Sequence, residues 1–213
     1  MPAAPLASPL ILASSSRYRH ELLSRLRLPF TVFAPAVDEA GLPGEAPAAM
    51  ALRLALAKAH AVARLRPDAV VIGSDQVADL GGIAIGKPGT HERAVAQLRQ
   101  MSGQRVVFQT AVAVVHAGTG FERALLAPVV VRFRALGEDE IEHYLRLEMP
   151  YDCAGSAKCE TLGIALLASI ESDDPTALIG LPLIRTCELL REAGIDPLGS
   201  AVDGDGRGEA GPA

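Results

Sequence analysis

The sequence predicts an α/β fold in which a mixed, twisted sheet is flanked by helices. Apolar runs typical of β-strands alternate along the chain with amphipathic helical patterns. Two consecutive long strand patterns, at residues 106–116 and 124–134, are joined by a short glycine-containing turn, which indicates an antiparallel hairpin. A chain of 213 residues with 49% hydrophobic content can bury a full core, as one domain or as two lobes that share a cleft.

The individual elements follow from apolar spacing and from turn residues. The helix expected at residues 16–28 places three leucines on one face and has serines available as caps. The strand that begins at Val70 is followed by a Gly81-Gly82 turn and a second short apolar run, which predicts a hairpin. The other expected strands cover residues 10–13, 30–34 and 163–170, and the other expected helices cover residues 47–65, 91–101, 138–147 and 183–193.

The ends of the chain are expected to lie outside the folded unit. We expect residues 1–9 to form an N-terminal extension, residues 10–198 to form the folded domain, and residues 199–213 to form a disordered tail, because the tail is Gly/Asp-rich and has almost nothing to bury. The first nine residues lack a basic region, and no run of eighteen apolar residues occurs. The sequence therefore predicts no signal peptide and no membrane association.

Charge and cysteine content narrow the function. The net charge is −5 and there is no lysine or arginine run. The expected partner is therefore a small ligand and not a nucleic acid polymer. The three cysteines lack metal-site spacing and are odd in number, which favours a reducing, cytoplasmic location over a disulfide scaffold or a zinc site.

Asp75 is the first candidate for chemistry. It follows the apolar run Val70–Gly73, and in open α/β folds catalytic groups gather where strands end. The hairpin after it leads to Lys87, and we expect that hairpin to bring a cation close to the carboxylate. A carboxylate and a lysine placed in this way suit a metal-assisted reaction on phosphate.

Further polar residues follow other strands and helices, and each has a simpler alternative. The Ser14–Ser16 turn with Arg19 opens a helix and suits an anion, although plain helix capping would also explain it. Glu39 could join Asp75 at Mg²⁺, or lie in a solvated loop. Lys58 interrupts an apolar helix, so it either contacts phosphate or extends to solvent.

The order of these motifs resembles that of the Maf family of nucleoside triphosphate pyrophosphatases over residues 10–198. The motifs are Leu12-Ala13-Ser14-Ser15-Ser16 with Arg19, Val37-Asp38-Glu39, Ala57-Lys58-Ala59, Ile72-Gly73-Ser74-Asp75-Gln76, Gly86-Lys87-Pro88, Cys153-Ala154-Gly155-Ser156 and Gly180-Leu181-Pro182. The resemblance implies a fold like that of house-cleaning inosine triphosphate pyrophosphatases, with two lobes around a cleft. It also implies hydrolysis of a nucleoside triphosphate to a monophosphate and pyrophosphate.

The resemblance also assigns roles. It implies that Ser14, Arg19, Lys58 and Lys87 hold the triphosphate and that Glu39 and Asp75 bind a divalent metal cation, Mg²⁺ or Mn²⁺. Catalysis would rest on Asp75, Glu39 and Lys87, with Asp75 as the base that activates water. A homodimer is implied by the resemblance alone.

Three positions bear on the base that is recognised. Tyr18, Gln76 and Glu160 resemble the branch of the family that acts on 7-methyl-GTP, where tryptophan is the usual aromatic residue in the place of Tyr18. A methylated, cationic guanine should stack on an aromatic ring, and a carboxylate can accept hydrogen bonds from guanine's donors. The simpler alternatives are surface packing for Tyr18 and an ion pair with Lys158 for Glu160.

Two other functions stay open at this point. One is hydrolysis of dTTP, UTP or another noncanonical nucleotide. The other is a nucleotide-sensing binding protein that inhibits septum formation and hydrolyses nucleotide only incidentally. The sequence keeps every residue of the proposed catalytic set, which favours an enzyme.

Overall fold

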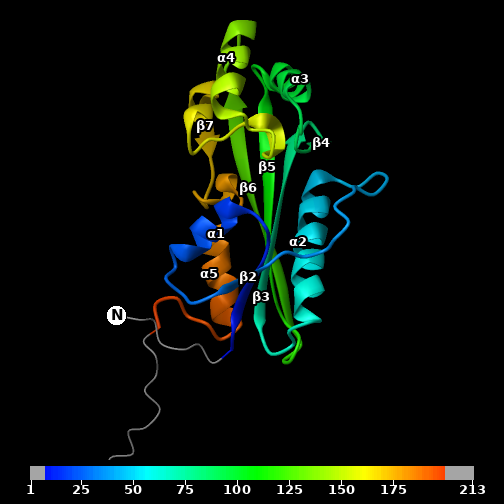
Figure 1. The fold of residues 1–213 in the computed structure, drawn as a ribbon, viewed down its shortest axis with the longest axis vertical. Coiled ribbons are helices and arrows are strands. Elements are labelled where there is room, and N and C mark those ends of the chain that lie inside the picture. Colours follow the sequence, from blue (N-terminus) through cyan, green and yellow to red (C-terminus); the bar gives the residue numbers. More distant parts are fainter. Residues whose placement is uncertain (1–7, 200–213) are drawn as a thin grey trace, which may run out of the picture.

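The computed structural model describes residues 8–199 of the chain (Figure 1). Most of the predicted N-terminal extension (1–9) and all but one residue of the predicted tail (199–213) lie outside these described residues. No helix in the described part of the chain is long and apolar enough to cross a membrane.

Residues 8–199 contain one seven-stranded mixed sheet, as the sequence predicts. Its order is β2-β1-β3-β5-β6-β7, and β4 pairs with the far end of β3. The strands β2, β1 and β3 run parallel, whereas all pairs from β3 to β7 are antiparallel. The strands are β1 (Leu10–Ala13), β2 (Thr31–Phe33), β3 (Val70–Leu80), β4 (Ile83–Ile85), β5 (Arg105–His116), β6 (Phe121–Phe133) and β7 (Leu167–Glu171).

Helices cover both faces of this sheet. Figure 1 shows α2 on one face near the lower end of the sheet, α1 and α5 on the opposite face, and α3 and α4 at the upper end. Local capping explains where some helices begin: Pro47 is the first residue of α2, and the Thr90 hydroxyl accepts from the Arg93 N–H at the start of α3. The helices are α1 (Arg17–Ser24), α2 (Pro47–Ala63), α3 (His91–Met101), α4 (Glu138–Glu148) and α5 (Leu183–Glu192).

Three apolar clusters divide the molecule into two lobes. In the lower lobe, one cluster lies between the sheet and α2, and a second lies between the sheet and α1 and α5. In the upper lobe, a single cluster joins α3 and α4 to the far halves of β3, β5 and β6. The long strands β3, β5 and β6 pass through both lobes, so one continuous sheet joins the lobes (Figure 1).

The structure corrects the prediction that a strand ends at Asp75. β3 continues to Leu80, and the strand that stops is its neighbour β1, whose last pair joins Ala13 to Gly73. β4 begins to pair only at Ala78, so among the described strands residues 74–77 pair with β5 alone. Asp75 therefore lies beside the end of a strand rather than at one, on an open edge of the sheet.

Among the other element boundaries that differ from the prediction, those of α1 and β7 differ most. α1 ends at Ser24, not at residue 28, and is followed by tight turns before Pro29, which disfavours helical backbone at the residue before it. The strand expected at residues 163–170 is divided into a short 3₁₀ turn, η2 (Leu162–Leu166), and β7. Two further 3₁₀ turns are η1 (Ala154–Ser156) and η3 (Ala177–Ile179).

Candidate active site

A cleft of about 1240 Å³ lies between the lobes. It contains residues from α1, α2, β3, the segment after β4 and the turns that follow α4 and β7. All nine predicted site residues line this cleft: Ser14, Tyr18, Arg19, Glu39, Lys58, Asp75, Gln76, Lys87 and Glu160. The structure therefore brings the predicted set together, although the chemical role of each residue stays a prediction.

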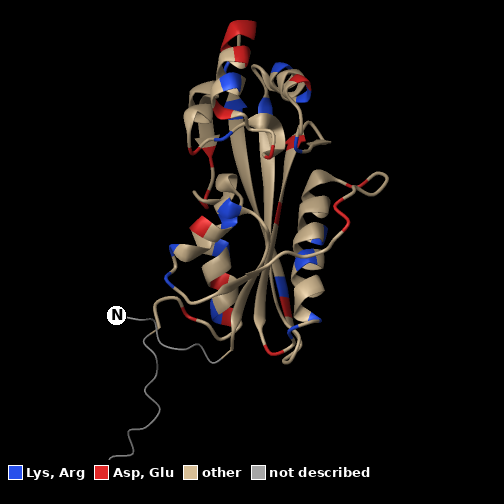
Figure 2. Ribbon diagram, in the orientation of Figure 1, with Lys and Arg blue, Asp and Glu red and all other residues tan. Residues whose placement is uncertain are grey.

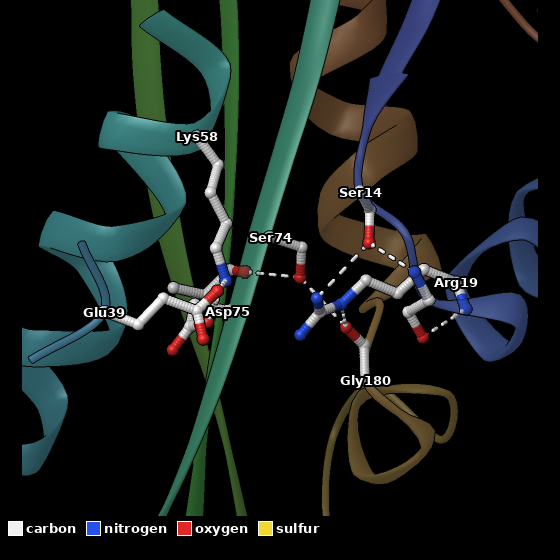
Figure 3. Close-up of polar contacts among 9 residues, drawn as sticks. Ser14, Arg19, Glu39, Lys58, Ser74, Asp75 and Gly180 are labelled. Atoms are coloured by element: carbon white, nitrogen blue, oxygen red, sulfur yellow. Dashed lines mark hydrogen bonds and ion pairs between the residues drawn. The ribbon is translucent and has the colours of Figure 1, made fainter. Parts of the chain in front are cut away.

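The open edge of β3 divides the cleft into two sides. Successive strand residues point to opposite faces of a sheet, so Gly73 and Asp75 face α2 whereas Ser74 and Gln76 face the α1 side. Figure 3 shows β3 passing between the Lys58–Glu39–Asp75 cluster and a second cluster built from Ser14, Arg19, Ser74 and Gly180. A ligand in this cleft can therefore contact groups from both faces of one strand.

On the α2 side, Lys58 bridges two carboxylates. Its Nζ lies 2.6 Å from Oδ1 of Asp75 and 2.6 Å from Oε1 of Glu39. Only 7% of the Lys58 side chain and 9% of the Asp75 side chain is exposed, against 52% for Glu39. The alternative that Lys58 extends to solvent is therefore wrong, and the lysine is instead a nearly buried cation that holds both carboxylates in place.

The charges in the cleft change the titration of Glu39. Partial burial by itself would raise the pKa of Glu39, but the hydrogen bond from Lys58 and the positive charges of Lys58, Lys87 and Arg19 outweigh it, so the pKa lies below its ordinary value. Lys87 is exposed in the segment between β4 and α3. It makes no ion pair within 4.0 Å among the described residues, so the hairpin exists as predicted but does not place Lys87 directly against Asp75.

A glycine sets the distance between α2 and β3. A Cβ on Gly73 would lie 2.2 Å from the Ala55 carbonyl oxygen and 2.7 Å from the Ala59 nitrogen, both in the backbone of α2. Only a residue without a side chain allows this approach. The close backbone contact brings Lys58 of the helix within direct reach of Asp75, two residues beyond the glycine.

On the α1 side, the carbonyl of Gly180 orients Arg19. The Arg19 Nε donates to this oxygen at 2.9 Å, and the Ser74 hydroxyl lies 2.9 Å from the same oxygen (Figure 3). Burial lowers the pKa of Arg19, while the carboxylates of Asp75 and Glu39 act in the opposite direction. Arginine stays charged in proteins, and its Nη2 is directed to no acceptor among the described residues, so it is available for an anion.

Gln76 has a defined orientation. Its Nε2 lies within 3.0 Å of the Thr110 hydroxyl and of the carbonyl oxygens of Ala177 and Leu178. Since carbonyl oxygens only accept hydrogen bonds, the NH₂ group must point to them, which leaves Oε1 as the part of the side chain that can accept from a ligand. Ser74 and Gln76 together attach the turn at η3 to β3.

Glu160 and Tyr18 lie where a base could contact them. Lys158 does not pair with Glu160: its Nζ donates to the Glu148 carbonyl oxygen at 3.1 Å and lies 3.9 Å from Asp152. Among the described residues no cation lies within 4.0 Å of the Glu160 carboxylate, so the alternative of an ion pair with Lys158 is wrong. The guanidinium carbon of Arg17 lies 4.8 Å from the centroid of the Tyr18 ring, and Arg17 Nη2 donates to the Tyr18 hydroxyl at 2.8 Å.

Sequence reasoning missed one residue that supports Glu160. The Glu148 carboxylate, at the end of α4, accepts from the Thr161 hydroxyl at 3.0 Å and from the Leu162 N–H at 3.1 Å. These bonds hold the chain directly after Glu160. A glutamate at the end of a helix gives no sequence signal of such a contact, since its partners lie in an irregular turn 13 and 14 residues away.

The carboxylate oxygens of Glu39 and Asp75 suit a hard cation that takes only part of its ligands from the protein. Glu39 Oε1 and Asp75 Oδ1 both contact the Lys58 ammonium, so a divalent cation would bind the other oxygens of these two carboxylates or displace the ammonium. No group of three or more His, Cys, Asp or Glu side chains suited to a metal occurs among residues 8–199. Two carboxylates completed by water and substrate phosphate are a common arrangement for Mg²⁺, whereas structural zinc requires four protein ligands.

Comparison with known proteins covers nearly the whole of the described chain. The family described as Maf-like protein matches residues 9–193. A relative from Polaromonas sp. (strain JS666 / ATCC BAA-500), named 7-methyl-GTP pyrophosphatase, is 69% identical over 191 residues, or 90% of this chain and 87% of the relative. A relative of the same name from Albidiferax ferrireducens is 63% identical over 92% of this chain and 98% of its own length, and one from Thiobacillus denitrificans is 57% identical over 89% and 94%. The chain belongs to the Maf family.

Proposed function

We propose that this chain is a nucleoside triphosphate pyrophosphatase that hydrolyses 7-methyl-GTP to 7-methyl-GMP and pyrophosphate. The observation that carries the proposal is that one cleft holds cations and carboxylates suited to a triphosphate and, in the same lining, an aromatic ring and two acceptors suited to a methylated guanine. The names of the Polaromonas and Albidiferax relatives support the same substrate.

The triphosphate would be held by charge from both sides of β3. Arg19, already oriented by Gly180, would present its Nη2 to phosphate oxygens, and the Ser14–Ser16 turn adds hydroxyl and main-chain donors at the start of α1. Lys58 and Lys87 would approach the phosphates from the other side. Neutralising this charge is the main requirement for attack at phosphorus.

Asp75 would activate or orient the attacking water at the α-phosphorus. Its carboxylate has a fixed position because Lys58 and the backbone of β3 hold it, and such positioning is itself a source of catalysis. Glu39 and Asp75 would also hold a divalent cation, Mg²⁺ or Mn²⁺, which supplies positive charge for the leaving pyrophosphate when bound.

Base selection would depend on hydrogen-bond polarity. The Watson–Crick edge of guanine carries N–H donors, which Glu160 and the Oε1 atom of Gln76 can accept. Uracil and thymine have a single N–H between two carbonyl oxygens, and those oxygens would face acceptors. Stacking of a base on the ring of Tyr18 would contribute roughly 1–3 kcal/mol. The positive charge of a 7-methylated guanine would strengthen this stacking, because a cation is attracted to the face of an aromatic ring.

Pyrophosphate release with Mg²⁺ tests the proposal. The panel is 7-methyl-GTP, GTP, dTTP, UTP, CTP and ITP, with Asp75→Asn as the inactive control and Glu160→Gln as the selectivity variant. We expect preference for 7-methyl-GTP, loss of activity in Asp75→Asn, and a reduced preference in Glu160→Gln. Preference for dTTP or UTP would keep the chemistry and reject the base assignment. Absence of Asp75-dependent release from every nucleotide would reject the enzyme and favour a nucleotide-sensing binding protein.

A further inference from the structure

The segment that carries Glu39 is held without help from the apolar core. Residues 34–46 contain no helix or strand, and every residue from Asp38 to Gly44 is exposed. Figure 1 shows this part of the chain extending outward beyond α2 before the helix begins. Hydrophobic packing therefore does not determine where Glu39 lies, and polar contacts must do so.

A forked ion pair at the start of α2 supplies those contacts. Arg53 Nε lies 2.6 Å from Glu45 Oε1, and Arg53 Nη2 lies 2.7 Å from Glu45 Oε2. The same Nη2 donates to the carbonyl oxygen of Ala40 at 3.0 Å, and Glu45 Oε2 accepts from the Leu42 N–H at 3.0 Å. The Glu45 side chain is only 9% exposed, so this pair is better shielded than an ordinary surface ion pair.

These bonds act on the backbone directly beside Glu39. Ala40 is the next residue after Glu39, and Arg53 belongs to the same helix as Lys58, which holds the Glu39 carboxylate at 2.6 Å. α2 therefore contacts this part of the chain at two points. Arg53 binds the main-chain carbonyl of Ala40, and Lys58 binds the side-chain carboxylate of Glu39. The carboxylate alone is half exposed, so Lys58 without the main-chain contact would leave the segment attached at a single point.

We propose that Arg53, oriented by Glu45, is a positioning residue that fixes Glu39 beside Asp75 for the divalent cation. The part of this proposal that concerns the cation rests on the proposed function. The pair joins α2 to an exposed segment, and neither Arg53 nor Glu45 belongs to an apolar core cluster, so its loss can lower stability without dismantling the core. Loss of the pair should therefore free Glu39 and leave the remainder of the molecule folded.

The test uses the full chain and the variants Arg53→Ala, Arg53→Lys, Glu45→Gln, Glu39→Gln and the double variant Arg53→Ala/Glu39→Gln. Arg99→Ala is the matched control, because Arg99 forms a similar forked pair with Glu138, at 2.9 and 2.5 Å, between α3 and α4 and outside the cleft lining. Three quantities are measured: the Kd for Mn²⁺ without nucleotide, by electron paramagnetic resonance; amide hydrogen exchange of peptides covering residues 36–44; and kcat and KM for 7-methyl-GTP.

Arg53→Ala should weaken Mn²⁺ binding by about fivefold or more and lower kcat by a similar factor, with KM changed less than twofold. Exchange should accelerate in residues 36–44 alone, and Arg53→Lys should rescue only part of the loss because lysine cannot form the fork. In the double variant, Arg53→Ala should add nothing to the effect of Glu39→Gln, since Arg53 acts through Glu39. Arg99→Ala should match wild type throughout.

Two results would overturn the proposal. One is wild-type Mn²⁺ affinity and exchange in Arg53→Ala. The other is an equal further loss of Mn²⁺ affinity when Arg53→Ala is added to Glu39→Gln, because independent effects would show that Arg53 does not act through Glu39. Failure of the proposed function is a separate outcome: a wild-type chain inert on every nucleotide would reject the activity, while Mn²⁺ binding and hydrogen exchange would still decide the role of Arg53.

Discussion

Lys58 and Asp75 form a nearly buried ion pair, with 2.6 Å between Nζ and Oδ1 and less than a tenth of either side chain exposed. Removing one partner of such a pair leaves a charge without compensation, which is more costly than removing both. We expect Lys58→Met to lower the free energy of unfolding by about 3 kcal/mol. Urea denaturation monitored by circular dichroism measures this change.

The double variant Lys58→Met/Asp75→Asn is the control for that prediction. It removes both charges at once, so we expect it to be more stable than Lys58→Met alone. Equal stability of the two variants would mean that the uncompensated carboxylate is not the source of the loss.

The contact between Gly73 and α2 predicts an unusually damaging alanine. Gly73→Ala would place a methyl group 2.2 Å from a helix carbonyl oxygen, so α2 or β3 must move. Overpacking of this kind costs about 3 kcal/mol or more when backbone blocks relaxation. Thermal unfolding measures the effect, with Gly86→Ala as the matched control because a Cβ there meets no atom within 4 Å. Similar melting temperatures for the two variants would contradict the close contact.

The Arg17–Tyr18 contact predicts a change in substrate preference. Arg17 places a cation over the ring that a cationic base would also use, at 4.8 Å from the ring centroid. Arg17→Gln should therefore lower KM for 7-methyl-GTP severalfold and change KM for GTP, whose base is uncharged, much less. Steady-state kinetics with both nucleotides measures the ratio. An equal change in the two KM values would indicate that Arg17 acts on the phosphates instead.

Glu45 predicts a specific pH dependence of stability. The hydrogen bonds from Arg53 and from the Leu42 N–H lower the pKa of Glu45 from 4.5 to about 2. Because the folded-state pKa is depressed, the stabilisation is complete above about pH 4.5 and is lost as the pH falls toward 2. The difference in free energy of unfolding between wild type and Glu45→Gln should be constant from pH 7 to 5 and shrink below that. A difference independent of pH down to pH 3 would refute this assignment.

Local patterns in the sequence predicted most of the fold and the members of the cleft. The periodicity of apolar residues identified the antiparallel pair β5 and β6 and the helices α2 and α3, because each depends on burial along one element. The course of β3 past Asp75 was not predicted. A change from apolar to polar residues at Ser74 is typical of the end of a strand. Residues 74–76 nevertheless belong to β3, and they lie on an open edge of the sheet because β1 stops pairing at Gly73.

The supporting contacts could not be predicted because they join distant segments without a sequence pattern. Arg53 and Glu45 are eight residues apart, across the start of a helix, and the Gly180 carbonyl meets Arg19 over 161 residues. Figure 2 shows acidic and basic residues interspersed over both lobes, so charge alone does not mark which pairs matter. These contacts depend on the tertiary fold, which the spacing of residues along the sequence does not predict.

The register between β3 and β5 determines which side of the sheet Asp75 and Gln76 face. Asp75 and Gln76 are neighbours in sequence and face opposite sides of the sheet, opposite Ala111 and Thr110 of β5. A slip of one residue between these strands would turn the proposed hydrolytic carboxylate toward η3 and the proposed base-selecting amide toward Lys58. The long β5–β6 hairpin touches neither Lys58 nor Arg19 through a hydrogen bond among the described residues. It nevertheless determines which face of the sheet carries the proposed hydrolytic carboxylate and which carries the proposed base-selecting amide. Substitutions that loosen its register should therefore abolish activity without altering any of the proposed nucleotide-binding residues.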